Sequence, residues 1–194
     1  MRRRVAVAPI VLAGVLAAVL AGTPGAAVAG TLTRRDPVGD VARSPIGTSS
    51  YAPAPTQVQG DIVATRVVHA RRAIWVQVRL RELTTATNGN FHLIAIRSRW
   101  RLRTVEIDAL PGHWEGRSVT TDARGRAVAC AVTYRIDYDR NRVMLRMPRS
   151  CLGRPPWVQV AVRSTVAGSR YVYADDAGAT GFTGALVFGP RVRS

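Results

Sequence analysis

The chain has 194 residues, and 28 basic residues, all of them arginine, stand against 12 acids, giving a formal net charge of +16 at pH 7. A length of this order suits one domain with a single hydrophobic core. The arginines are spread along the chain, and the absence of lysine resembles the bias of a GC-rich genome. The charge therefore disfavours a dedicated nucleic-acid role, and attraction to anionic surfaces is the better interpretation.

The first 29 residues have the three-part pattern of a secretory signal peptide. Arg2, Arg3 and Arg4 precede an apolar run, Pro24 and Gly25 break it, and Ala27-Val28-Ala29 supplies the small residues of a cleavage site. An uncleaved N-terminal anchor is the alternative. We expect cleavage after Ala29, secretion, and a mature chain without a membrane span. Without the leader, 25 arginines against 12 acids leave a net charge of +13.

The remaining chain divides at residue 60. Residues 30–60 are rich in Pro, Gly, Ser and Thr and predict an irregular N-terminal arm or loop packed on the domain. From residue 61 to residue 194 apolar residues recur with period two between turn signals, which predicts an all-β fold. The expected strands are 61–69, 74–81, 92–96, 102–107, 117–121, 128–136, 143–147 and 158–162, with a helical turn over 148–152. Eight short antiparallel strands at this spacing favour a two-sheet, jelly-roll-like β-sandwich.

The two cysteines, Cys130 and Cys151, are expected to form a disulfide, because such bonds persist in exported proteins. If Arg140 and Asn141 are the central residues of a hairpin turn, cross-strand partners have numbers that add to 281, as Cys130 and Cys151 do. A register slip of one or two residues would still leave the cysteines close enough to bond. The bridge would stabilise the fold by about 3 kcal/mol.

Several of the few acids stand beside turn residues. Asp36 and Asp40 flank Pro37-Val38-Gly39, Asp61 follows Gly60, and Asp175 and Asp176 are adjacent. Calcium takes six to eight oxygen ligands, which loops supply from carboxylates and carbonyls. These five aspartates are candidate Ca²⁺ ligands. The alternative is that each caps its own turn through local hydrogen bonds.

Three tryptophans are candidate ligand-binding residues. Trp75 occupies the phase opposite to the apolar face of its strand, and Trp100 and Trp114 fall in or near turns. Exposed indole rings would stack on sugar rings or pack on a partner, whereas in the alternative they are ordinary core or edge residues.

The motifs together carry a resemblance to a known family. D-P-x-G-D at 36–40, an aromatic and Pro-rich spacer at 51–55, Gly60-Asp61-Ile62, and V-x-V-x-L-R-E-L at 76–83 resemble DOMON-like β-sandwich modules, which include family 9 carbohydrate-binding modules. The stretch from 138 to 158 is similar to small exported proteins of actinobacteria. The resemblance spans about residues 36–176. It implies a two-sheet sandwich, a calcium near Asp36, Asp40 and Asp61, and sugar or other ligand binding.

We expect a secreted, non-catalytic β-sandwich that binds a ligand at the cell envelope, with a glycan as the ligand class. No residue constellation typical of an enzyme is present in the sequence. The alternative is a structural protein whose Arg-rich surface docks on an anionic cell-wall polymer. Salt separates the two, because stacking on sugars survives screening and surface docking does not.

Overall fold

The protein is represented by a computed structural model, which describes residues 29–180, 182 and 184–194. The expected signal peptide, residues 1–29, lies outside the described residues apart from Ala29. Within the described ranges the elements are, in order, β1 (Gly30–Arg35), β2 (Ala42–Pro45), β3 (Ala52–Pro53), β4 (Ile62–His69), β5 (Ala73–Leu80), β6 (Gly89–Arg97), β7 (Leu102–Leu110), β8 (His113–Thr121), β9 (Thr133–Asp137), β10 (Arg142–Pro148), the 3-10 helix η1 (Arg149–Leu152), β11 (Trp157–Ala167), β12 (Tyr171–Asp176) and β13 (Val192–Arg193).

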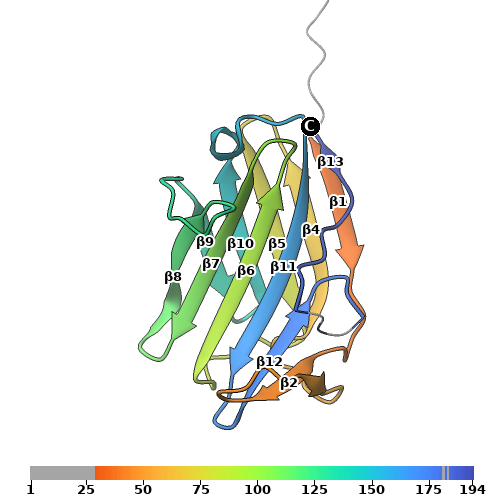
Figure 1. Cartoon of the computed structure of the whole chain (residues 1–194), viewed down its shortest axis with the longest axis vertical. Helices are drawn as coiled ribbons and strands as arrows, with labels where there is room; N and C mark the ends of the chain where they lie inside the picture. The colour runs from red at the N-terminus through yellow and green to blue at the C-terminus, as the bar shows by residue number, and fades with distance from the viewer. Residues whose placement is uncertain (1–28, 181, 183) are drawn as a thin grey trace, which may run out of the picture.

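The strands form two antiparallel sheets that pack face to face (Figure 1). The five-stranded sheet has the order β1-β4-β5-β10-β9. The second sheet has the order β3-β2-β12-β11-β6-β7-β8, with β13 beside β11. In Figure 1, β6, β7 and β11 lie in front, and β4, β5 and β10 lie behind them. The all-β sandwich expected from the sequence is confirmed.

The core lies between the sheets and follows from the period-two pattern. Successive side chains of a strand point to opposite faces, so alternate residues of β5 and β10 are buried. Leu145 on β10 is 1% exposed, whereas Trp75 on β5 points outward and is 48% exposed. The second sheet contributes fully buried branched side chains from β6 and β7, among them Ile94, Ile96, Val105 and Ile107. Removing this apolar surface from water is the main force that holds the sheets together.

The segment 30–60 is not the irregular arm that its composition predicts, because it contains β1, β2 and β3. β1 pairs with β4 from Gly30–His69 to Arg35–Ala64, and β2 pairs with β12. β1 is an edge strand in which Leu32 packs against the core while its neighbours are exposed. An edge strand that buries so little apolar surface has no hydrophobic run, which explains the wrong prediction. The sandwich therefore begins at Gly30 rather than at residue 61.

The disulfide between Cys130 and Cys151 is confirmed, with their Cα atoms 5.8 Å apart. The register that predicted it is wrong by two. β9 and β10 pair Asp137 with Arg142, so partner numbers add to 279, and the turn spans 138–141. Asn141 ends this turn with φ +50°, a left-handed conformation that asparagine tolerates. The cysteines lie outside the ladder, Cys130 before β9 and Cys151 in η1, where a two-residue offset is accommodated.

Candidate cation site

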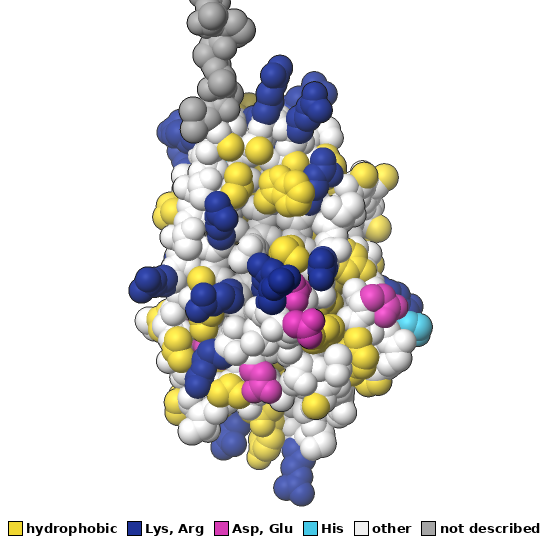
Figure 2. All heavy atoms as spheres, turned by 180° about the vertical axis from the view of Figure 1, so that it is seen from behind, with side chains coloured by type: hydrophobic (Ala, Val, Ile, Leu, Met, Phe, Trp, Pro, Cys, Tyr) yellow, Lys and Arg dark blue, Asp and Glu magenta, His cyan; other side chains and the backbone are white. Residues whose placement is uncertain are grey.

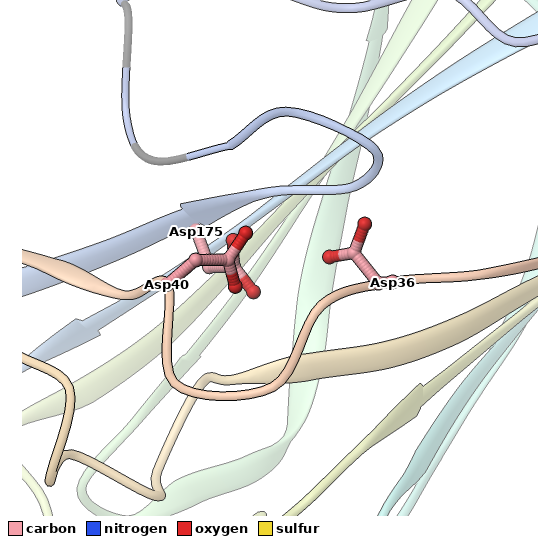
Figure 3. A group of neighbouring side chains, drawn as sticks. All are labelled: Asp36, Asp40 and Asp175. Carbon is pink, nitrogen blue, oxygen red and sulfur yellow. The ribbon is translucent and has the colours of Figure 1, made fainter.

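Three of the predicted aspartates meet where β1 leaves the five-stranded sheet. Asp36 follows β1 directly, Asp40 lies in the connection to β2, and Asp175 belongs to β12 of the second sheet. Carboxylate oxygens of the three lie within 4.8 Å of one another. Figure 3 shows the three side chains directed into one space from two chain segments. Gly39, with φ +83°, provides the left-handed turn residue that leads the chain into Asp40.

A fourth aspartate, Asp61, is completely buried at the start of β4 and adjoins this group. Its Oδ2 accepts hydrogen bonds from the Gly39 backbone N–H at 2.9 Å and from Arg81 Nη1 at 3.1 Å. Asp61 thus fixes the loop between Asp36 and Asp40. We call Asp36, Asp40, Asp61 and Asp175 the acidic cluster.

Asp36 and Asp175 each have one carboxylate oxygen that accepts a hydrogen bond from a backbone N–H. Gly178 N–H donates to Asp36 Oδ1, and Ile62 N–H donates to Asp175 Oδ2 at 2.7 Å. Among the described residues, the second oxygens, Asp36 Oδ2, Asp61 Oδ1 and Asp175 Oδ1, are buried without a hydrogen-bond partner. Buried polar atoms in native proteins are nearly always satisfied, so three unsatisfied carboxylate oxygens need an explanation. A hard cation supplies one, because it binds carboxylate oxygens directly.

The electrostatics of the acidic cluster agree with this explanation. Burial raises the pKa of Asp36 to about 7, with a further increase from the neighbouring charges of Asp40 and Asp61. Burial likewise raises the pKa of Asp175 to about 8, and Asp40, Asp36 and Asp61 add to the increase. Carboxylates that share a poorly solvated space repel one another when ionised. A cation would remove the repulsion and favour the ionised forms.

Asp176, the fifth predicted ligand, does not join the acidic cluster. Its two oxygens accept hydrogen bonds from Arg163 Nε at 2.6 Å and Arg163 Nη2 at 2.9 Å. Because neighbouring residues of a strand face opposite sides, Asp175 and Asp176 cannot serve the same site from β12. Asp176 is instead the carboxylate of a buried ion pair.

A groove of about 360 Å³ adjoins the acidic cluster through Asp40. Tyr51 and Phe182 line it with ring centroids 4.1 Å apart, and Arg163 lies 4.5 Å above the Phe182 ring. A weak signal for Tyr51 was present in the sequence, because this residue belongs to the aromatic spacer at 51–55. Nothing in the sequence pointed to Phe182, because it contacts Tyr51 only through the tertiary fold.

The three predicted ligand-binding tryptophans lie on different elements. Trp75 on β5 is 48% exposed, and Trp100, in the turn between β6 and β7, is 60% exposed. Trp114 on β8 is half-buried and packs edge-on against Tyr138 with ring centroids 6.4 Å apart. Within the described part of the chain, no ring contact joins any two of the three. They do not form one aromatic clamp, and each remains a separate candidate.

No family model, curated protein or solved structure matches the chain. The similarity to DOMON-like modules therefore stays a prediction from the sequence. Across the described ranges, no helix is long and apolar enough to cross a membrane.

Proposed function

We propose that the protein is an exported, non-catalytic β-sandwich that holds a Ca²⁺ ion in the acidic cluster and binds a glycan at the cell envelope. The observation that carries the proposal is the convergence of carboxylate oxygens of Asp36, Asp40 and Asp175 within 4.8 Å, together with the buried, unsatisfied Oδ2 of Asp36 and Oδ1 of Asp175. Oxygen-only donors on a turn are the ligands that Ca²⁺ prefers, and its irregular coordination suits a site built from several segments. Export is supported by the predicted leader and by the disulfide.

The groove beside Asp40 is the proposed position of the glycan. Tyr51 and Phe182 offer aromatic surface, and Asp40 and Thr180 offer polar atoms at its wall. A mostly apolar hollow with a few polar groups is the usual composition of a small-ligand site. Because Asp40 belongs both to the acidic cluster and to this wall, Ca²⁺ binding would fix the groove in shape. Glycan binding should therefore depend on calcium.

Calcium binding is tested by calorimetry and thermal melting of the mature protein. A cation that binds only the folded state stabilises it by about 2.7 kcal/mol at a hundredfold excess over its dissociation constant. Asp175→Asn keeps the side-chain volume, removes one ligand charge and should abolish the calcium response. Asp139→Asn, at an exposed turn residue outside the acidic cluster, is the matched control and should leave the response intact. A melting temperature indifferent to calcium and to chelator would refute the site.

Glycan binding is tested on a glycan array with calcium and with chelator. Tyr51→Ala should remove a calcium-dependent signal. Trp100→Ala should not, because Trp100 lies in the turn between β6 and β7 and does not line the groove. If Trp75→Ala, Trp100→Ala or Trp114→Ala removes the signal and Tyr51→Ala does not, the sugar binds at the tryptophans. Absence of any signal in either buffer would refute glycan binding while leaving the cation site standing.

A further inference from the structure

The outer face of the five-stranded sheet is strongly basic. Val76, Val78, Val143 and Leu145 point inward from β5 and β10, so the residues between them point to solvent. The outward positions of the sheet carry six arginines around Trp75: Arg35, Arg66, Arg79, Arg135, Arg142 and Arg146. We call these six arginines and Trp75 the basic face. Figure 2 looks onto it and shows arginines spread over the sheet rather than gathered in one hollow.

The basic face has little negative charge of its own. Asp137 is its one acid at the outward ladder positions, and it is surrounded by Arg142 Nε at 3.3 Å, Arg140 Nη1 at 3.6 Å and Arg135 Nη2 at 4.0 Å. Across the described ranges, the other four arginines of the face, Arg35, Arg66, Arg79 and Arg146, make no ion pair. Unlike the arginines that surround Asp137, these four have guanidinium groups available for a partner's acidic groups.

The opposite face of the sandwich differs. The outward positions of β6, β7, β8, β11 and β12 include three acids, Glu106, Asp108 and Asp176, against three arginines, Arg97, Arg117 and Arg163. Two of these arginines face acids directly across the ladder, Arg117 opposite Asp108 and Arg163 opposite Asp176. A general bias toward arginine would load both faces alike. The positive charge is therefore a property of one face and not only of the composition.

The geometry of the basic face suits an extended partner. Strands lie about 4.8 Å apart and alternate residues of a strand about 7 Å apart, so five strands place the guanidinium groups over a surface roughly 19 Å wide. Trp75 lies within this array, and the guanidinium of Arg146 is 5.5 Å from its ring centroid. The planar guanidinium fork pairs bidentately with carboxylate and similar acidic groups. An exposed indole ring offers a flat apolar surface beside these charges.

We propose that the basic face binds a linear acidic polysaccharide, whose acidic groups pair with the arginines and one of whose sugar rings lies against Trp75. Repeated acidic groups match an array of charges on a flat surface better than a single small anion would. The exposed indole favours a chain of sugar rings over an anionic polymer without them. This surface is separate from the acidic cluster and its groove, so the proposal does not rest on the calcium site.

The test uses a hyaluronan fragment of defined length, which carries one carboxylate per disaccharide, and measures its affinity for the mature protein by calorimetry. Binding is expected at low salt and should weaken as salt screens the charges. The triple variant Arg35→Gln/Arg66→Gln/Arg79→Gln should lower the affinity by about tenfold. Trp75→Ala should lower the affinity while leaving its salt dependence unchanged.

The matched control is Arg99→Gln/Arg117→Gln/Arg124→Gln, which removes the same charge from exposed arginines outside the basic face. It should change the affinity by less than about twofold. Equal losses in the two triple variants would overturn the proposal, because net charge alone would then explain binding. Equally tight binding of a single-stranded oligonucleotide or of anionic lipid vesicles would overturn the choice of partner. Failure of hyaluronan to bind at low salt would overturn the proposal outright.

Discussion

The disulfide between Cys130 and Cys151 allows a quantitative test of what holds one side of the sandwich. It joins the segment before β9 to η1 across a sequence separation of 21 residues. In the chain-entropy account, closing a loop of this size removes enough freedom from the unfolded chain to stabilise the fold by about 3 kcal/mol. Cys130→Ala/Cys151→Ala retains both Cβ atoms, so the lost packing against the core is a smaller contribution. We expect a loss of about 3 kcal/mol in the free energy of unfolding.

Urea denaturation and thermal melting measure this loss. For a domain of this size each kcal/mol corresponds to about 2–4 °C, so the melting temperature should fall by roughly 6–12 °C. The wild-type protein in reductant is the matched control, because it loses the bond and keeps both side chains. Its melting temperature should fall nearly as far as that of the double variant.

Two results would refute this reasoning. A loss below about 1 kcal/mol in the double variant would show that loop closure contributes little here. Two alkylated thiols in the native protein, detected by intact mass without reductant, would show that the bridge does not form.

Further predictions concern the acidic cluster and the core. Because burial raises the pKa of Asp36 to about 7 and of Asp175 to about 8, the cation-free native state keeps protons that the unfolded chain releases near pH 4. Its stability should fall as the pH rises from about 4 to about 8, and calcium should remove most of that fall, as melting curves across this range would show. Gly60→Ala should cost more than about 1 kcal/mol in urea denaturation, because φ is +81° and the new Cβ would lie 2.8 Å from Val166 Cγ2. Gly47→Ala, with φ +84° and no atom within 4 Å, should cost only the backbone part, so equal losses would contradict the steric argument. Leu145→Ala should cost about 2–5 kcal/mol by the same measurement, and a loss below 1 kcal/mol would contradict its place in the core.

The sequence predicted the parts of the fold in which local pattern and burial agree. β5 alternates cleanly because Ile74, Val76 and Val78 face a core that covers only one side of the sheet. β1 and β12 were missed for opposite reasons. β1 buries too little apolar surface to show a pattern, and the last residues of β12, Ala174 to Asp176, are buried although two of them are acids. An acid is buried in a strand when other residues bind its carboxylate, and here those residues, Ile62 and Arg163, are distant in the sequence.

In the acidic cluster, too, the residues that could be predicted are those marked by their neighbours in the sequence, and the others depend on contacts between distant parts of the chain. The spacing of Asp36 and Asp40 around Gly39 marked a turn, and Asp61 was singled out by its place after Gly60. Asp175 rather than Asp176 completes the cluster because of the direction in which each side chain of β12 points. In the ladder Asp176 lies opposite Arg163 and pairs with it, so Asp175 points to the other face of the sheet. Phe182 could not have been predicted, because its contact with Tyr51 joins positions 131 residues apart in the chain.

The two edge strands of the five-stranded sheet, β1 and β9, are each linked to the rest of the sandwich by a contact outside the ladder. β1 forms one edge, and Asp36 directly after it accepts a hydrogen bond from the backbone N–H of Gly178, in the segment that follows β12 of the second sheet. β9 forms the other edge, and the disulfide attaches the segment that leads into it to η1. An edge strand has a ladder on one side only, so its attachment depends on such additional links. Both links attach an edge of the sheet to a neighbouring segment, whereas arginines on its outer surface, such as Arg66 and Arg79, face solvent where a partner can reach them.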